Sequence, residues 1–225
     1  MPLAIAHRGD PLGARENTLE AFASAVRLGA DMVELDLRRT ADGTIVVLHD
    51  ATLLRLWGLD RPVDSLELAE VEAVGEDGLR IPTLRRVLDE VALPLMVDFT
   101  GPEVVEGALE AVRDGRALAR SLFVTGNVEA LAQLRSLAPG ARVGLTWTRP
   151  GPPPLDLLGN LGAECWNPAF GLVTAEAVAA VHAAGHRVST WTVDDPKDMA
   201  AVADAGVDAI VSNRIADLRA VLTDR

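Results

Sequence analysis

Three pieces of sequence decide the fold: the run Arg187-Val-Ser-Thr-Trp191, the pair Asp195-Pro196 and the run Ala209-Ile-Val-Ser212. The two runs are short and largely apolar, as buried strands are. Asp195 with Pro196 is typical of a helix start, and Gly206 is typical of a helix end. A strand, a helix and a second strand in this order indicate two parallel strands of one sheet.

The same alternation of strand and helix extends over nearly all of the 225 residues and occurs about eight times. It predicts a parallel sheet, and at this length a closed (β/α)8 TIM barrel of the α/β class, with a doubly wound open sheet as the alternative. No G-x-G-x-x-G follows the first run, as a dinucleotide fold would usually have. We expect one domain, residues 1–225. The expected strands are Leu3–Ala6, Met32–Leu37, Ile45–Leu48, Pro94–Phe99, Ser121–Thr125, Arg142–Thr146, Glu164–Asn167, Arg187–Trp191 and Ala209–Ser212, and the expected helices are Thr18–Leu28, Leu84–Val91, Glu103–Ala119, Val128–Leu137, Ala175–Ala184, Pro196–Ala205 and Ile215–Leu222.

Two segments interrupt the alternation. Asp50–Arg80 mixes polar and apolar residues, and we interpret it as a long active-site loop that contains a short helix. Arg149–Pro154 is rich in proline and is typical of a rigid turn. Because the alternation resumes after this turn, it is not a linker between domains.

The composition restricts the partners and the compartment. A net charge of −12 argues against nucleic acid or an anionic membrane surface as the main partner. The single cysteine, Cys165, excludes an internal disulfide and fits a reducing compartment. The sequence shows no signal segment and no apolar stretch near the ~20 residues of a membrane span, so a cytoplasmic protein without stable membrane insertion is expected. The oligomeric state is left open.

The second expected strand carries acidic residues on one face. Glu34 and Asp36 point the same way, followed on that face by Arg38, because side chains alternate along a strand. Buried carboxylates are costly unless cations accompany them. Mg²⁺ or Ca²⁺ is the simplest companion, since hard cations bind carboxylate oxygens. The alternative is a structural ion pair of these acids with Arg8 or Arg38.

Two histidines follow strand-like runs close to these acids. His7 ends the first run and His49 follows the run Ile45–Leu48, so either can act as a general acid or base. His182 and His186 are four residues apart but lack the intervening glutamate of a zinc-protease helix. We interpret these last two histidines as structural or surface residues.

The ordered motifs resemble one enzyme family. Several short motifs occur in a single order between Ala6 and about Leu222. Their order resembles the glycerophosphodiester phosphodiesterase family, whose members are metal-dependent TIM barrels. The motifs are Ala6-His7-Arg8-Gly9, Glu16-Asn17-Thr18, Glu34-Leu35-Asp36, Thr40-Ala41-Asp42-Gly43, His49-Asp50, Ile81-Pro82-Thr83-Leu84 and Trp191-Thr192-Val193.

The resemblance implies a role for each matching residue. It implies an acid/base pair of histidines, carboxylate ligands for a divalent metal and an arginine that binds phosphate. It also implies a glutamate near the metal and histidines and a tryptophan near the pocket mouth, although core filling explains that tryptophan equally well. The implied residues are His7 and His49 as the acid/base pair, Glu34 and Asp36 as metal ligands, Arg8 as the phosphate-binding residue, and Glu16 and Trp191 near the substrate.

The chain also departs from the family pattern. Where the family usually has Glu-x-Lys, this chain has Asp98-Phe99-Thr100. Asp98 resembles the aspartate of the related phospholipase D toxins and is the expected third metal ligand, but Thr100 cannot replace the charge of a lysine. Arg38 is the candidate substitute for that charge in substrate binding. Further departures are Ser212-Asn213 and Thr125-Gly126, and the weaker cationic candidates, expected as surface charges, are Arg149, Lys197 and Arg214.

The resemblance and the residues together predict a metal-dependent phosphodiesterase. The expected products are glycerol 3-phosphate and an alcohol, with Mg²⁺ or Ca²⁺ as cofactor and a small-molecule phosphodiester as substrate. One alternative is a lysophospholipase D-like or cyclising phosphodiesterase. Another is a degenerate barrel that binds phosphodiesters without turnover. His7 and His49 argue against this second alternative, since a binding protein needs no acid/base pair.

Overall fold

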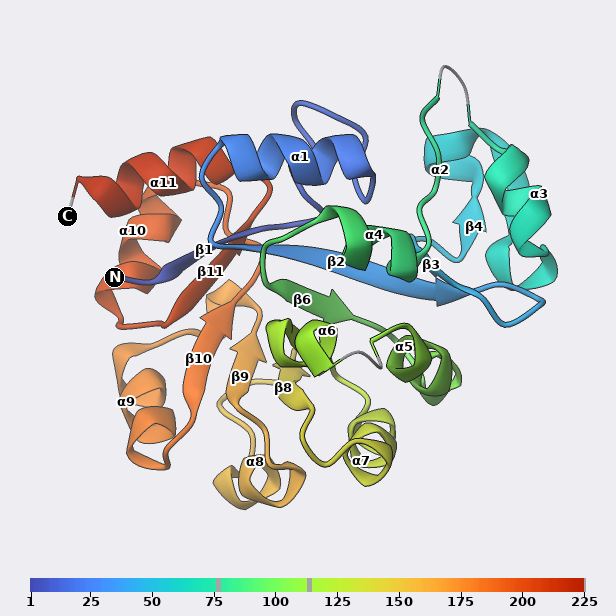
Figure 1. Ribbon diagram of the computed structural model, residues 1–225. Helices are drawn as coiled ribbons and strands as arrows, with labels where there is room; N and C mark the ends of the chain where they lie inside the picture. Colours follow the sequence, from blue (N-terminus) through green and yellow to red (C-terminus); the bar gives the residue numbers. More distant parts are fainter. Residues whose placement is uncertain (76–77, 113–114, 225) are drawn as a thin grey trace.

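The computed structural model describes residues 1–75, 78–112 and 115–224. Within these ranges, eight parallel strands form a closed barrel with helices on its outside (Figure 1). The barrel closes because β1 pairs with β2 on one side and with β11 on the other. The predicted TIM barrel is confirmed. The barrel strands are β1 (Leu3–Ala6), β2 (Met32–Arg39), β6 (Leu95–Asp98), β7 (Ser121–Thr125), β8 (Arg142–Trp147), β9 (Cys165–Pro168), β10 (Arg187–Thr190) and β11 (Ala209–Ser212).

Helices begin at the residues whose side chains can cap them. Thr18, Thr174 and Asp195 each accept a hydrogen bond from a backbone N–H in the first turn of a helix. Gly185 and Gly206 follow helices in the left-handed conformation, as expected for helix ends. The helices outside the segment 50–80 are α1 (Leu19–Arg27), α4 (Leu84–Glu90), α5 (Val105–Ala111), α6 (Gly115–Arg120), α7 (Val128–Leu137), α8 (Leu155–Leu161), α9 (Ala175–Ala183), α10 (Pro196–Asp204) and α11 (Ile215–Thr223), with short 3₁₀ turns η2 (Pro102–Val104) and η3 (Phe170–Leu172).

One predicted strand lies outside the barrel. Ile45–Leu48 was expected among the parallel strands, but β3 (Ile45–Val47) pairs antiparallel with the end of β2. The turn between them is tight, because Thr40 N–H donates to the Thr44 carbonyl oxygen at 3.0 Å and Gly43 has a φ of +88°. A hairpin this short joins only antiparallel strands. His49 therefore follows a hairpin strand beside the barrel.

The helices of the structure differ from the predicted ones at two places. The expected helix Glu103–Ala119 is divided into η2, α5 and α6, and its residues 113–114 lie outside the described part. Helix α8, Leu155–Leu161, was not predicted. This helix is only seven residues long and contains Gly159, a residue that disfavours helices, so its sequence gives a weak helix signal.

The segment expected as a long loop, Asp50–Arg80, is a small structured excursion, and its residues 76–77 lie outside the described part. It forms a short hairpin and helical turns whose Leu53, Leu66 and Val71 belong to an apolar cluster that also includes Val46 and Leu48. Figure 1 shows it beside the barrel, next to β3. Its elements are β4 (Thr52–Leu53), α2 (Leu54–Trp57), β5 (Leu59–Pro62), η1 (Val63–Ser65) and α3 (Leu68–Ala73).

The apolar core has one layer between strands and helices and a second inside the barrel. Leu35 and Val33 of β2 belong to the outer layer, whereas Ile5 and Met96 belong to the inner one. Side chains alternate between these two layers along β2, so its acidic residues point toward the barrel axis, as predicted. Among the described residues, no helix is both long and apolar enough to cross a membrane. The cytoplasmic location stays a prediction.

Candidate active site

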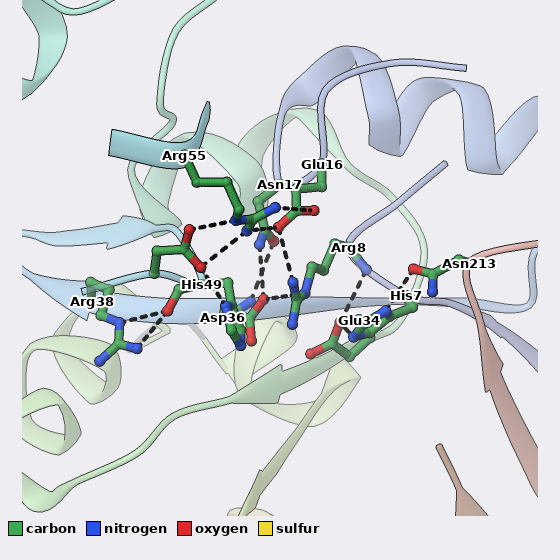
Figure 2. Close-up of polar contacts among 11 residues, drawn as sticks. His7, Arg8, Glu16, Asn17, Glu34, Asp36, Arg38, His49, Arg55 and Asn213 are labelled. Atoms are coloured by element: carbon green, nitrogen blue, oxygen red, sulfur yellow. Dashed lines mark hydrogen bonds and ion pairs between the residues drawn. The ribbon is translucent and has the colours of Figure 1, made fainter. Parts of the chain in front are cut away.

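A cavity of about 160 Å³ lies at the carboxyl ends of the barrel strands, where TIM-barrel enzymes place their active sites. Seven of the nine predicted site residues line it, and Figure 2 shows most of them with their contacts. Glu16 and Arg38 are not among the lining residues. The predicted residues that line the cavity are His7, Arg8, Glu34, Asp36, His49, Asp98 and Trp191, joined by Met96, Val124, Asn167 and Val211.

The chain turns sharply directly after β1. Arg8 and Gly9 both have positive φ, +57° and +87°. A Cβ on Gly9 would lie 2.7 Å from the backbone carbon of Ala21, so this close approach requires glycine. The turn directs the Arg8 N–H to Glu34 Oε2, at 3.0 Å. The His-Arg-Gly motif thus attaches the loop after β1 to the acidic face of β2.

Three carboxylates meet inside the barrel. Asp36 of β2 pairs in register with Asp98 of β6. Glu34 lies two residues before Asp36, on the same face of β2. One oxygen of each of the three lies within 4.8 Å of the others. Burial, reinforced by the charges of its neighbours, raises the pKa of Glu34 well above its usual value, and the same causes raise the pKa of Asp98 to about 7.

This donor set fits a divalent cation. Mutual repulsion and burial disfavour three ionised carboxylates together, whereas a hard cation stabilises them in this form. Asp36 is also oriented by its neighbours. Arg8 Nε lies 3.0 Å from Asp36 Oδ2, and Asn17 Nδ2 donates to the same oxygen at 2.8 Å. Oδ1 of Asp36, together with Glu34 and Asp98, can therefore serve a metal.

His7 lies deep in the pocket. Its Nδ1 lies 2.7 Å from Asn213 Oδ1, and its Nε2 lies 3.9 Å from Glu34 Oε2. Burial and the positive charge of Arg8 lower the pKa of His7, which favours the neutral imidazole. A neutral histidine with a free ring nitrogen toward the cavity can accept a proton.

His49 also lines the cavity and directly precedes the excursion. Its Nδ1 lies 2.7 Å from Asp50 Oδ1, which orients the ring. Its backbone carbonyl oxygen accepts hydrogen bonds from Arg38 Nε and Nη2, the first at 2.9 Å. Arg38 Nη1 also lies 3.4 Å from Thr100 Oγ1. The guanidinium of Arg38 therefore contacts the backbone that carries His49 (Figure 2).

An arginine that the sequence analysis missed connects the excursion to the barrel. Arg55 of α2 donates to both carboxylate oxygens of Glu16 and of Asp50. Hydrogen bonds from Arg55 lower the pKa of Asp50 to about 2, and together with the charge of Arg8 they lower the pKa of Glu16 although burial opposes this. Glu16 also accepts from Arg8 Nη1 at 2.9 Å. No pattern around Arg55 in the sequence indicates this role.

The remaining predicted residues lie as follows. Trp191 is half-buried at the pocket wall, and its Nε1 donates to the Asn167 carbonyl oxygen at 3.0 Å.

His182 pairs with Asp208 at the surface. The thiol of Cys165 is buried, which raises its pKa to about 12. Away from the cavity, His186 Nδ1 lies near the Ala163 carbonyl oxygen, Arg149 stacks on Trp147, Arg214 pairs with Asp217, and Lys197 is exposed on α10.

Comparison with known proteins identifies the family to which the chain belongs. Residues 7–217 match the model of the glycerophosphoryl diester phosphodiesterase family. The chain belongs to this family. Within it, the glycerophosphodiester phosphodiesterase of Caldanaerobacter subterraneus is 31% identical over 227 residues, which cover 94% of this chain and 93% of that protein. The chain is therefore an enzyme of the phosphodiesterase class, and the family resemblance seen in the sequence is confirmed.

Two other relatives are informative. The structure of a phosphodiesterase from Oleispira antarctica, in complex with the product sn-glycerol-3-phosphate, matches this fold with a TM-score of 0.89 at 22% identity, covering 99% of this chain and 97% of that one. A mouse lysophospholipase D is 45% identical over 111 residues, which cover 42% of this chain and 35% of that protein.

Proposed function

We propose that the chain, acting as one domain over residues 1–225, hydrolyses glycerophosphodiesters to glycerol 3-phosphate and an alcohol, with a divalent metal and two histidines. One observation carries the proposal: two histidines, three clustered carboxylates and Arg8 face a single cavity at the carboxyl end of the barrel. Each group matches a need of phosphodiester cleavage, namely proton transfer, cation binding and neutralisation of phosphate charge. The product named for the Oleispira relative agrees with this substrate class.

Glu34, Asp36 and Asp98 would hold Mg²⁺ or Ca²⁺. When bound, such an ion polarises a phosphoryl oxygen and neutralises charge that develops on it. Arg8 lines the same cavity and would bind the phosphate, while its contacts with Glu16 and Asp36 hold it in place. Trp191 forms a wall for the organic part of the substrate. Glu16 and Arg38 act indirectly, since neither lines the cavity.

The two histidines transfer protons. One histidine removes the proton from a hydroxyl, and the new oxygen–phosphorus bond forms as the bond to the leaving alcohol breaks. The other histidine protonates the departing oxygen. Because the glycerol group carries a hydroxyl beside its phosphate ester, that hydroxyl can attack to give a cyclic phosphate, which water then opens. His7 and His49 both line the cavity, as such a pair requires.

A second candidate is lysophospholipase D-like activity, favoured by the 45% identity of a 111-residue segment to the mouse enzyme. A panel of glycerophosphodiesters and lysophospholipids, assayed with Mg²⁺, with Ca²⁺ and with EDTA, separates the candidates. Glycerol 3-phosphate from water-soluble diesters supports the proposal. Turnover of lysolipids alone supports the second candidate. Binding without turnover of any diester, or activity unaffected by EDTA, contradicts the proposed mechanism.

A further inference from the structure

The side chain of Asn213 lies between His7 and an aspartate that no sequence motif identified. Asn213 Oδ1 is 2.7 Å from His7 Nδ1, and Asn213 Nδ2 donates to Asp194 Oδ2 at 2.8 Å. His7 follows β1, Asn213 follows β11, and Asp194 lies after β10, so three neighbouring barrel strands supply the three residues. Figure 2 shows Asn213 directed at the His7 ring.

Asp194 determines the orientation of the Asn213 side-chain amide, that is, where its oxygen and its NH₂ group lie. Asp194 Oδ1 accepts from the Asn213 N–H at 2.9 Å and from Ser212 Oγ at 3.0 Å, which holds the carboxylate in place. An ionised carboxylate only accepts hydrogen bonds, so the amide group facing it must be the NH₂. The amide oxygen must then face His7, and a contact of 2.7 Å between this oxygen and Nδ1 requires a proton on Nδ1.

The consequence concerns the other ring nitrogen of His7. In a neutral imidazole only one nitrogen carries a proton, so Nε2 keeps its lone pair. His7 lines the cavity, and its Nε2 lies 3.9 Å from Oε2 of Glu34, a carboxylate that lines the same cavity. A histidine without such a partner favours the opposite tautomer, in which Nε2 would carry the proton and could not accept one.

We propose that Asn213, oriented by Asp194, is a positioning residue that fixes His7 in the Nδ1-protonated tautomer. This inference rests on the proposed function for its catalytic meaning: His7 Nε2 takes the proton of the attacking hydroxyl as the oxygen–phosphorus bond forms. His49 then gives its proton to the leaving oxygen as the other oxygen–phosphorus bond breaks. A neutral amide backed by a carboxylate thus performs the orienting role that a carboxylate performs in a catalytic triad.

The tautomer can be measured directly, without any assay of activity. The chain has four histidines, so protein labelled with heavy nitrogen in the histidine rings gives four pairs of ring-nitrogen signals, which single His→Gln variants assign. We expect the metal-free wild type at pH 8 to show His7 protonated at Nδ1 and unprotonated at Nε2. A His7 ring protonated at Nε2, or an even mixture of the two tautomers, would overturn the proposal.

Two variants test the cause. Asn213→Leu has a similar size and no acceptor, so His7 should lose the Nδ1-protonated signature, and kcat should fall by about 100-fold with little change in KM. The double variant Asp194→Asn/Asn213→Asp reverses the polarity of the pair. The amide introduced at position 194 then donates to the carboxylate introduced at position 213, and this carboxylate still accepts from His7. We expect the double variant to restore the signature and most of kcat, which a merely structural contact would not do.

Asp208→Asn serves as the matched control, because Asp208 is the side-chain partner of the surface residue His182. It should change the signals of His182 alone and leave kcat unchanged. An Asn213→Leu protein that is folded by circular dichroism but keeps both the His7 signature and kcat contradicts the proposal. If wild-type protein hydrolyses no glycerophosphodiester, the proposed function fails, while the ring signals still decide the tautomer.

Discussion

The backbone carbonyl oxygen of His49 accepts hydrogen bonds from both Nε and Nη2 of Arg38, the first at 2.9 Å. This contact joins the last part of β2 to the residue directly before the excursion. From the sequence, Arg38 is expected to replace a phosphate-binding lysine. We propose that the contact gives its guanidinium a further role, which is to hold the backbone that carries His49.

Arg38→Lys separates these two roles. Lysine keeps the positive charge but cannot donate two parallel hydrogen bonds to one carbonyl oxygen. We expect kcat to fall by up to about 100-fold, because a displacement of ~1 Å of a catalytic group is enough for that loss. Steady-state kinetics with a glycerophosphodiester measures it. Arg39→Lys, at an exposed neighbouring position, is the control and should be unaffected. Full activity of Arg38→Lys would favour the charge role.

His49→Ala should lower metal-dependent hydrolysis by about 10²- to 10⁴-fold, since that is the range that a general acid or base contributes. The fold should persist, because the His49 side chain is 45% exposed and its deletion leaves no cavity. Single-turnover assays with saturating Mg²⁺ or Ca²⁺ measure the loss. His182→Ala is the matched control at the surface. Unchanged hydrolysis by the His49 variant would exclude the histidine pair.

The metal-free protein should become less stable as the pH rises from about 4 to about 7. The pKa of Asp98 is raised from 3.8 to about 7, so the folded state binds more protons than the unfolded state in this window, and each proton removed there destabilises the fold. Melting temperatures in EDTA across this range test the sign. Added Mg²⁺ or Ca²⁺ should raise the melting temperature more at pH 8 than at pH 5.

Asp98→Asn provides the control for this experiment. It removes one of the repelling charges, so the EDTA melting temperature should depend less on pH, and the gain from added metal should shrink. A wild-type melting temperature that falls no more than that of Asp98→Asn between pH 4 and pH 7 in EDTA would contradict the assignment of repelling carboxylates at this site.

Arg55→Gln should loosen the excursion from the barrel. Arg55 is about half-exposed and bridges Glu16 and Asp50, so we expect a loss of about 1 kcal/mol in the free energy that holds the segment. The pKa of Asp50 is lowered to about 2, and the contact should therefore persist at pH 5 and weaken only as the pH falls toward 2. Faster proteolytic cleavage within residues 50–75 would report the effect. Arg61→Gln, which removes the pair of Arg61 with Glu70 inside the excursion, should leave the attachment to Glu16 intact.

Gly144→Ala should destabilise the barrel by about 1–3 kcal/mol, the usual cost of overpacking. A Cβ at this position would lie 2.5 Å from Cys165 Sγ, on the inner face of β8. Combining it with Cys165→Ala should recover part of the loss, because the clashing atom is removed. Urea unfolding of the two single variants and the double variant measures the coupling, and strict additivity of the two losses would contradict the clash.

Much of the fold follows from local sequence. Short buried runs, capping residues such as Thr18 and Asp195, and glycines after helices are local features, and all of them are legible in order along the chain. These local features were sufficient to predict a closed parallel barrel. The antiparallel β3 was predicted wrongly because its residues are as apolar as those of a barrel strand. Only the tight turn at Gly43 determines its direction.

The residue types that can do the chemistry are visible in the amino-acid sequence: the histidines, the carboxylates and Arg8, each directly after or within a strand. Which of their atoms face one another depends on the folded barrel. Asn213 reaches His7, Asp194 reaches Asn213, and Arg55 reaches Glu16 from the excursion, through contacts between residues 19 to 206 positions apart. The physical reason is that strand patterning depends on neighbours along the chain, whereas hydrogen-bond partners depend on closure of the barrel.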